Sequence, residues 1–423
     1  MLKNKYNYMI CVFCACLFLF FSYNVYASDD SKPKVDRYKT WTIIFNQPID
    51  VTKLTKDSIQ VKDKNNNLIN VGLRRWPNTC TVLVSPPEKG YDLGEEYTLV
   101  ITKQVYSEEN KQIKEGKSFN FKIKETSEEP IVFKDSAFER LVRDKVDKPE
   151  WEPLYKSDVE NITELMEQNC GRKDNNTIKD ISGIENLVNL KSFILTYSQI
   201  EDISPLKNLT NLQTLWLYDD NITDISPLKG LINLKELELY GNQIVDIPSL
   251  KGLTNLEDIN LGNNKIHDIT LLKELPNLQS LNLVYNNITD ISSLKGLSNL
   301  KDLNLGSNKI ADISPLKGLI NLNSLSLDDN NITDISSIKS LTNLDSLILD
   351  GNNITDISLL KGLPNLRELN LGNNKIADIN QLKELTNLTG LWLQDNPINR
   401  EFKEILKKYL PKCNIEFLIK QNN

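Results

Sequence analysis

Residues 212–233 read LQTLWLYDDNITDISPLKGLIN, and this stretch recurs with variation through the second half of the chain. Each copy opens with a leucine, and ten such leucines stand 22 residues apart, at Leu190, Leu212, Leu234, Leu256, Leu278, Leu300, Leu322, Leu344, Leu366 and Leu388. A fixed period of this length indicates that one small structural unit is stacked many times. A single unit cannot bury its own apolar face, so each turn must pack on its neighbours and both ends need a cap.

The pattern inside the repeat predicts the path of the chain through one turn. Leu215 and Leu217 flank Trp216 as alternate residues of a short strand do, with the leucines pointing inward. Three residues after the last strand leucine comes an asparagine, where a buried amide can pair backbone groups of its own turn and the next turn. It stands at Asn242, Asn264, Asn286, Asn308, Asn330, Asn352, Asn374 and Asn396. The first two turns carry Ser198 and Asp220 instead, so we expect a less regular structure there.

The remainder of each turn has the composition of a tight convex segment. The motif Asp-Ile-Ser-Pro-Leu, as at residues 224–228, fits a short 3₁₀ turn, and we expect its aspartate to bond local backbone. One lysine per turn follows, at Lys207, Lys229, Lys251, Lys273, Lys295, Lys317, Lys339, Lys361 and Lys383. Like charges stacked in this way repel, so we interpret this row as a solubilising edge.

The 22-residue unit is a leucine-rich repeat. Together with the recurring Asn-Asn-Ile-Thr-Asp-Ile and the helical segment before the first turn, it resembles the internalin family of Gram-positive surface proteins. The resemblance implies a solenoid of short parallel strands and 3₁₀-type convex turns whose concave face binds host or envelope proteins. Two features depart from the family. An Ig-like segment precedes the repeats, whereas internalins place one after them, and the C-terminus shows no wall-sorting signal.

Residues 1–27 have the features of a signal peptide: two early lysines, an apolar run over residues 9–21, and Val-Tyr-Ala before an expected cleavage after Ala27. An uncleaved anchor helix is the alternative. Cleavage would remove two lysines and no acidic residue, and would lower the net charge from −7 to −9. An acidic chain does not suit nucleic acid or an anionic membrane as partner. We therefore expect a secreted or surface-associated monomer with no membrane span in the mature chain.

Residues 28–125 predict a small Ig-like β-sandwich. Segments of β character at residues 40–45, 59–61, 68–73, 81–84, 97–101 and 119–123 are separated by turn-forming stretches such as residues 65–67 and 86–87. The pieces at residues 45–50, 58–61 and 91–101 resemble the bacterial Ig-like domains of surface-layer and cell-wall proteins. That resemblance implies a spacer or docking role.

Residues 126–177 predict a linker and a helical cap. Asp135 is a plausible N-cap for a helix with Phe138 and Val142 on one face, and a second short helix is expected from residue 157, with Leu165 on its apolar side. The repeats then occupy residues 178–398. Residues 399–423 predict a C-terminal cap with a helix at 402–410 and a strand at 414–417. The predicted fold class is mixed: a small β-sandwich followed by a leucine-rich-repeat solenoid with a helical N-terminal cap.

The sequence offers little to catalysis or to metal binding. Outside the signal peptide the cysteines are Cys80, Cys170 and Cys413, an odd number with no zinc-binding spacing. Cys170 and Cys413 stand at opposite ends of the stack, about 45 Å apart, so we predict that they do not pair. His267 occupies a slot where other turns carry Thr, Ala or Val, which argues against a catalytic role. We predict a binding protein, not an enzyme, with no cofactor and no metal.

The outward strand positions form the candidate ligand-binding site. Acidic and aromatic residues occupy them, and no lysine or arginine does; with one tyrosine just beyond a strand they are Trp216, Tyr218, Glu236, Glu238, Tyr240, Asp258, Tyr285, Asp302, Asp328, Asp350, Glu368 and Trp392. Tyr197 also stands one place beyond a strand. Exposed tryptophan and tyrosine are typical binding anchors, and carboxylates suit a basic protein patch. We therefore predict a protein ligand, bound mainly by the N-terminal half. Carbohydrate or cell-wall binding through the same rings is the alternative, and a merely solvated strand face is the other interpretation.

Overall fold

The computed structural model describes residues 10–12, 32–75, 80–126, 128–167, 177–399 and 401–417. The chain divides into two compact units: Met1–Ile131 with Asp147–Lys156, and Val132–Val146 with Ser157–Asn423. We call them the sandwich unit and the solenoid unit. The expected signal peptide lies outside the described residues except for β1 (Ile10–Val12), which pairs in parallel with β3 (Trp41–Phe45).

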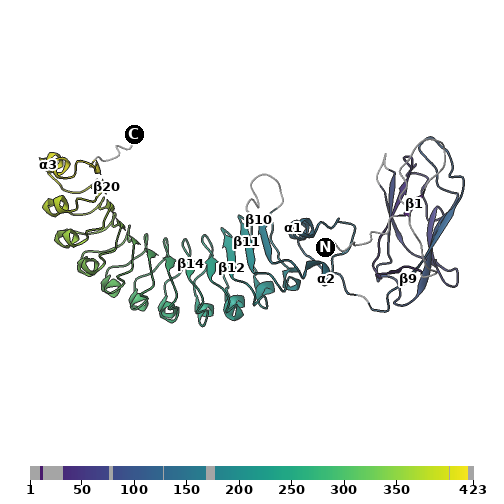
Figure 1. Ribbon diagram of the computed structural model, residues 1–423, viewed down its shortest axis with the longest axis horizontal. Coiled ribbons are helices and arrows are strands. Elements are labelled where there is room, and N and C mark those ends of the chain that lie inside the picture. Colours follow the sequence, from purple (N-terminus) through teal and green to yellow (C-terminus); the bar gives the residue numbers. More distant parts are fainter. Residues whose placement is uncertain are drawn as a thin grey trace, which may run out of the picture. The chain divides into compact units, whose positions relative to one another are not determined.

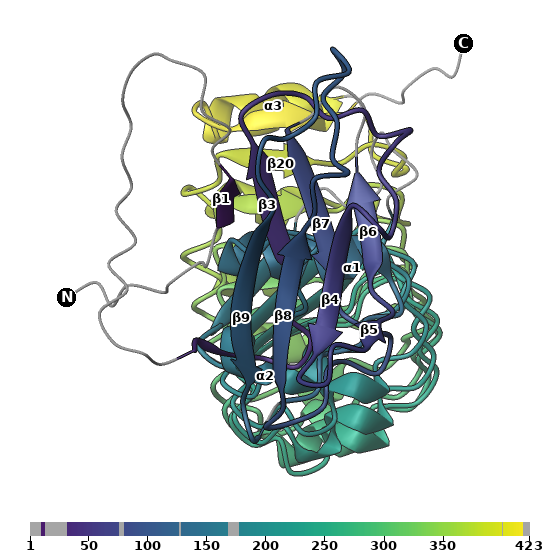
Figure 2. The same ribbon diagram turned by 90° about the vertical axis from the view of Figure 1, so that its right-hand side faces the viewer.

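Two sheets share one core in the sandwich unit (Figure 2). The first sheet has the order β1-β3-β7-β6, with β7 at Thr81–Ser85 and β6 at Gly72–Arg75. The second has the order β2-β9-β8-β4-β5, at Lys34–Val35, Lys117–Ile123, Glu96–Ile101, Ile59–Asp63 and Leu68–Ile69. Alternate residues of β3 and β8 are buried, and the Trp41 ring lies 4.8 Å from that of Phe121 across the core. Side chains from both inner faces therefore build a single core.

The segment 68–73, expected as one strand, forms two strands. β5 pairs with β4 in one sheet, whereas β6 pairs with β7 in the other. Ile69, Val71 and Leu73 all contact the shared core, so the spacing of two continues while the chain changes sheets. The alternating pattern cannot reveal this change, because both sheets present the same inner face to the core.

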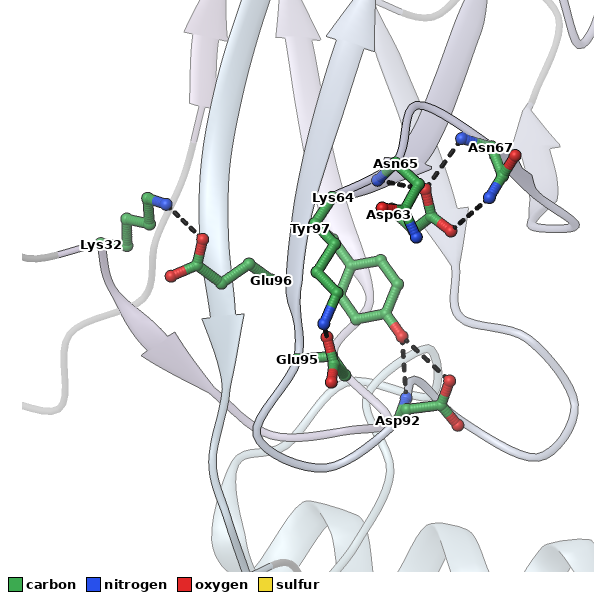
Figure 3. Close-up of polar contacts among 9 residues, drawn as sticks. All are labelled: Lys32, Asp63, Lys64, Asn65, Asn67, Asp92, Glu95, Glu96 and Tyr97. Carbon is green, nitrogen blue, oxygen red and sulfur yellow. Dashed lines mark hydrogen bonds and ion pairs between the residues drawn. The ribbon is translucent and has the colours of Figure 1, made fainter.

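Polar side chains hold the turns at the ends of these strands (Figure 3). The Oδ1 atom of Asp63 accepts the backbone N–H groups of Asn65 and Asn67, both at 2.8 Å, and its Oδ2 accepts the Asn67 side-chain amide at 2.9 Å. Asn66 has a φ of 65°, a left-handed conformation that asparagine tolerates. The expected turn at residues 65–67 is confirmed.

The solenoid unit is built on one parallel sheet of twelve strands, β10 to β21 in chain order. Their bounds are Glu164–Glu167, Ser192–Thr196, Thr214–Tyr218, Glu236–Glu238, Asp258–Asn260, Ser280–Asn282, Asp302–Asn304, Ser324–Ser326, Ser346–Ile348, Glu368–Asn370, Gly390–Trp392 and Asn414–Glu416. From β11 to β20 each residue pairs with the residue 22 positions further on, as Leu281 does with Leu303. The strands line the inner side of the arc and the 3₁₀ turns its outer side (Figure 1).

Each turn carries one 3₁₀ segment on the convex side. These segments lie at Ile184–Asn186, Ser204–Leu206, Ser226–Gly230, Pro248–Leu250, Thr270–Glu274, Ser292–Leu294, Ser314–Leu316, Ser336–Ser340, Ser358–Gly362 and Asn380–Glu384. The preceding aspartate starts the segment: Asp224 accepts the Ser226 backbone N–H and the Ser226 hydroxyl, both at 2.8 Å. The expected local role of the recurring aspartates is therefore confirmed.

The buried asparagines form a ladder of backbone hydrogen bonds. Asn308 donates its amide to the carbonyls of Leu283, Leu305 and Gly306 at 2.9–3.1 Å, and its Oδ1 accepts the N–H of Ile288 at 2.9 Å. Leu283 and Ile288 belong to the preceding turn, so the expected link to the next turn had the wrong direction. Each amide therefore pairs buried backbone groups of two neighbouring turns, as buried polar groups require.

A second asparagine ladder, for which the sequence suggested no role, closes the exposed end of each turn. Asn299 donates its side-chain amide to the carbonyl of Pro276 at 2.9 Å. The same bond to the carbonyl 23 residues earlier recurs at Asn211, Asn233, Asn255, Asn277, Asn321, Asn343, Asn365 and Asn387. The last residue of the repeat is therefore a structural clamp between neighbouring turns.

The first two turns use a different pair of side chains at the buried ladder position. The Ser198 hydroxyl donates to Asp220 Oδ1 at 2.7 Å, and the Ile200 N–H donates to the same oxygen at 2.9 Å. Asp220 Oδ2 is buried without a hydrogen-bond partner, and burial raises the pKa of this carboxyl to about 6. The strands of these two turns also differ from the rest of the stack, since β11 and β12 have five residues each, against three in each of β13 to β21.

Short elements flank the stack at both ends. Asp135 accepts the N–H groups of Ala137 and Phe138 at 2.8 and 3.1 Å, which confirms it as the N-cap of α1 (Ser136–Val146). α1 contacts β10, and the Phe138 ring packs edge-on against Phe193 of β11. The second helix, α2, spans only Lys156–Val159. Leu165 lies in β10 and not on that helix, because its strand adds an edge to the parallel sheet.

At the other end, α3 spans Glu401–Tyr409 and β21 pairs in parallel with β20, close to the expected bounds. Cys80 and Cys413 are free thiols, and Cys170 lies outside the described residues.

Candidate functional site

The outward side of the parallel sheet is the candidate functional surface, and we call it the concave face because it lines the inner side of the arc (Figure 1). In the three-residue strands β13 to β20 the middle residue is buried and its two neighbours point outward, in lateral rows that continue into β11 and β12. The first row contains Ser192, Thr214, Glu236, Asp258, Ser280, Asp302, Ser324, Ser346, Glu368 and Gly390. The second contains Ile194, Trp216, Glu238, Asn260, Asn282, Asn304, Ser326, Ile348, Asn370 and Trp392.

A third row follows two residues beyond the second. It contains Thr196, Tyr218, Tyr240, Gly262, Val284, Gly306, Asp328, Asp350, Gly372 and Gln394. The three rows hold seven carboxylates and neither lysine nor arginine. None of the ion pairs in the described part of the solenoid unit involves these seven groups. Among the described residues these seven carboxylates therefore have no salt-bridge partner, although Lys301, just outside the rows, acts electrostatically on Asp258.

Crowding of carboxylates is strongest on β13 and β14. Burial raises the pKa of Glu238, and Asp258 and Glu236 raise it further. Burial likewise raises the pKa of Asp258, the charges of Glu236, Glu257 and Asp302 raise it further, and Lys301 opposes the shift. Each carboxylate makes it harder to ionise its neighbours, because like charges repel in a partly desolvated setting. A positive group placed over this patch would be attracted by several carboxylates at once.

A second acidic patch lies further along the third row. Burial and then the charge of Asp328 raise the pKa of Asp350 to about 6. The Asn370 amide donates to Asp350 at 2.9 Å, and the Ser326 hydroxyl donates to Asp328. Both of these hydrogen-bond donors are neutral, and among the described residues no lysine or arginine forms an ion pair with either carboxylate.

Aromatic side chains gather at the N-terminal end of the face. The rings of Tyr218 and Tyr240 are stacked, with centroids 5.0 Å apart and an interplanar angle of 13°, and Tyr197 lies edge-on 6.0 Å from Tyr218. Trp216 is partly buried beside Ile194, its pairing partner in β11, and its indole N–H is buried without a hydrogen-bond partner. Trp216 is thus less exposed than a free anchor would be.

The structure brings only part of the predicted set together. Trp216, Tyr218, Tyr240, Glu236 and Glu238 lie on the adjacent strands β12 and β13 or directly after β13. Asp302, Asp328, Asp350 and Glu368 lie on later turns, and Trp392 lies on the last turn, at the opposite end of the face. The Trp392 ring lies over Gly390, since a Cβ there would approach it within 2.6 Å.

Sequence reasoning missed the apolar start of the second row. Ile194 points outward but is only 5% exposed, and Met166 of β10 pairs with it and is 49% exposed. Apolar residues at outward positions of β10 and β11 are the signal that could have found them. The concave face therefore begins with an apolar patch, Met166, Ile194 and Trp216, before the acidic residues.

Other chemistry is sparse in the described part of the chain. His267 is exposed in its convex slot, next to Asp268. Among the described residues no group of three His, Cys, Asp or Glu side chains could hold a metal ion. The search of the same residues for a helix long and apolar enough to cross a membrane found none.

The single parallel sheet, the buried asparagine ladder and the one 3₁₀ segment per turn define a leucine-rich-repeat solenoid. The family described as Leucine Rich repeats (2 copies) matches residues 188–230, 232–274, 276–318, 342–384 and 364–408. Leucine-rich-repeat proteins of this kind are generally protein-interaction modules. No curated protein sequence matches the chain.

Solved structures narrow the assignment. The internalin InlF of Listeria monocytogenes is 33% identical, with a TM-score of 0.60 over 69% of this chain and 92% of the InlF chain. Internalin C2 of the same organism is 34% identical over 53% of this chain and 95% of its own, with a TM-score of 0.47. The functional domain of InlJ, 21% identical with a TM-score of 0.58 over 67% and 59%, shares the fold. The chain belongs to the internalin family of leucine-rich-repeat proteins.

Proposed function

We propose that the protein is a secreted or surface-associated binding module that recognises a host or envelope protein with a basic patch through its concave face. The observation that carries this proposal is the negative charge of that face: seven carboxylates in three rows, with no lysine or arginine among them and no salt bridge to the other described residues. Complementary charge steers association and excludes wrong partners. A rigid parallel sheet adds an extended preformed surface, as solenoids generally offer.

The other parts of the chain fit this role as supports. We propose that the sandwich unit is an Ig-like spacer, that α1 and α2 cap the first turn, and that residues 1–27 direct secretion. The mature protein is proposed to act as a monomer. The solenoid unit then determines which partner is bound, and the sandwich unit holds the solenoid unit away from the cell surface.

Carbohydrate or cell-wall binding is the second candidate function. The tyrosines at the N-terminal end of the face favour it, because aromatic rings can also receive sugar rings, although Tyr218 and Tyr240 cover one face of each other. The carboxylates favour a protein with basic residues, since a neutral glycan gains nothing from uncompensated negative charge. The two candidates therefore differ in their dependence on salt and on charge reversal.

The test uses the chain without residues 1–27, immobilised and probed with surface proteins of candidate host cells and with purified cell-wall glycan. Glu236→Lys with Glu238→Lys should lower the association rate for a protein ligand about tenfold and flatten its salt dependence. Trp216→Ala should raise the dissociation rate. Lys295→Glu, on the convex side, is the matched charge-reversal control and should change neither rate. Loss of binding with Lys295→Glu alone would place the site on the convex edge and refute the proposal.

A further inference from the structure

In each of the ten turns the residue directly after the third row of the concave face adopts a left-handed backbone conformation. In eight turns it is short or flexible: Asp219, Gly241, Asn263, Ser307, Asp329, Gly351, Asn373 and Asp395. In the other two turns it is a tyrosine, Tyr197 with φ 58° and Tyr285 with φ 54°. Bulky side chains are true outliers in this region, because the Cβ atom crowds the following carbonyl.

The turn itself does not demand tyrosine. The Tyr285 N–H donates to the carbonyl of Gly306 at 3.1 Å, and Asp329 makes the equivalent bond to Asp350 at 2.8 Å. Burial does not compensate either, since Tyr197 is 42% and Tyr285 57% exposed. A bulky residue that is strained and largely exposed, as Tyr285 is, points to a function outside the fold.

The two tyrosines bracket a continuous aromatic and apolar strip. Tyr197 contacts Tyr218, and Tyr218 stacks on Tyr240. Gly262 follows in the third row, and its missing side chain leaves room for the Tyr240 ring on one side and Val284 on the other, both within 3 Å of where a Cβ would lie. Tyr285 follows Val284 directly. We call these five side chains, Tyr197, Tyr218, Tyr240, Val284 and Tyr285, the tyrosine strip.

The surroundings of the strip are anionic. Asp219 and Glu238 both act on the Tyr218 hydroxyl electrostatically. Aromatic faces attract guanidinium and ammonium groups, and carboxylates beside them add to that attraction.

We infer that the tyrosine strip binds an extended segment of the protein partner whose arginine or lysine side chains lie against the exposed parts of the tyrosine rings. This inference rests on the proposed function and adds where the partner binds: the bound segment runs across the strands, from Tyr197 to Tyr285. Four steps between neighbouring strands at roughly 4.8 Å give about 19 Å, which about six extended residues span. The carboxylates of β13 and β14 then steer the basic segment, and the rings hold it.

The experiment uses a fluorescent hexapeptide of alternating arginine and alanine, with a matched peptide in which citrulline replaces arginine and removes its charge. Binding to the mature chain is followed by fluorescence anisotropy at low salt. The wild-type chain should prefer the arginine peptide by about tenfold or more. Tyr285→Asn should weaken that binding about tenfold, and Tyr197→Asn should act in the same direction.

The stability of the same variants separates a binding role from a structural one. Tyr285→Asn places a residue there that tolerates the left-handed conformation, so its thermal midpoint should rise by about 1–3 °C while binding falls. Asn373→Tyr is the reverse control at the same position of a later turn: its midpoint should fall and its peptide affinity should stay unchanged. A lower midpoint for Tyr285→Asn would show that the ring supports the fold and would overturn the inference.

Two further outcomes separate this inference from the proposed function. If both tyrosine variants bind the arginine peptide like wild type while Glu236→Lys with Glu238→Lys does not, the acidic face is the site and the strip is not. If wild type fails to distinguish arginine from citrulline and binds purified cell-wall glycan instead, both the strip inference and the protein-binding proposal are wrong.

Discussion

The first two turns of the solenoid and the eight turns that follow use different side chains to pair the buried backbone groups between neighbouring turns. In the later turns an asparagine amide donates to three backbone carbonyls and its oxygen accepts one N–H, as at Asn308. In the second turn Asp220 accepts the N–H of Ile200 in the same way, but its other oxygen has no partner. An amide offers a donor and an acceptor at any pH, whereas a carboxyl group offers a donor only when it carries a proton.

This difference teaches that the buried ladder of the second turn depends on protonation, whereas the asparagine ladder of the later turns does not. By the spacing of the ladder, Oδ2 of Asp220 stands where an amide nitrogen would donate to the carbonyls of Leu195, Leu217 and Tyr218. Groups that bear on its ionisation are the Ser198 hydroxyl and Ile200 N–H, which favour the charged form, and the Asp219 carboxylate, which opposes it. Burial dominates and raises the pKa of Asp220 to about 6.

The largest effect is expected from Asp220→Asn, which would make the second turn like the later ones. Because the folded-state pKa lies above the unfolded value, the neutral carboxyl contributes stability below about pH 4 that is lost as the pH rises through about 6. A shift of about two pKa units corresponds to roughly 3 kcal/mol. At pH 7.5 the variant should therefore be more stable than wild type by up to about that amount.

Urea unfolding at pH 4 and pH 7.5 checks this prediction. The gap between Asp220→Asn and wild type should be small at the lower pH and wide at the higher one, because only Asp220 titrates differently in the two proteins. A gap independent of pH would show that the Asp220 carboxyl does not need its proton in the folded turn.

The next effect tests the regular part of the stack. Asn308→Ala removes four hydrogen bonds and leaves buried backbone groups unpaired, which should cost about 1–3 kcal/mol at every pH between 4 and 8. Asn331→Ala, at the exposed position after the ladder, is the control and should cost less than about 0.5 kcal/mol. Equal shifts of the denaturation midpoint for the two variants would contradict the ladder.

The smallest effect concerns the second, exposed ladder. Asn299→Ala removes a single side-chain bond to the carbonyl of Pro276, which water can replace, so the cost should be about 0.5–1 kcal/mol. Ser298→Ala, at an exposed neighbouring position, should be nearly neutral in the same thermal unfolding measurement. A cost for Asn299→Ala as large as that of Asn308→Ala would mean that the two ladders are equivalent, against their difference in burial.

The sequence alone was informative wherever a position serves the same purpose in every turn. Four features could be predicted in this way: the 22-residue spacing of leucines, the asparagine ladder, the aspartates of the convex turns and the outward rows. Equivalent residues of successive turns have the same neighbours, so one pattern describes them all. The terminal elements were harder. β10 was expected as part of a helix, since Leu165 fits a helical face as well as a strand.

The candidate site was predictable in composition and not in arrangement. The absence of basic residues from the outward rows can be read from the repeat, whereas the burial of Trp216 beside Ile194 depends on the neighbouring strand. Tyr285 was predicted as a ligand-binding residue because it is aromatic. That it is also strained could not be known, because the left-handed position appears only in the backbone angles.

The sequence by itself determined the solenoid and its chemistry, because each turn buries the same leucines against its neighbours and the hydrophobic effect acts on that pattern regardless of detail. Only the tertiary structure decided which groups lack a partner. Stacking places Asp220 Oδ2 in a buried position that an amide would satisfy, and it brings Tyr218 and Tyr240, 22 residues apart, into ring contact. Such facts depend on distances between turns, and a linear sequence contains no such distances until the turns are packed.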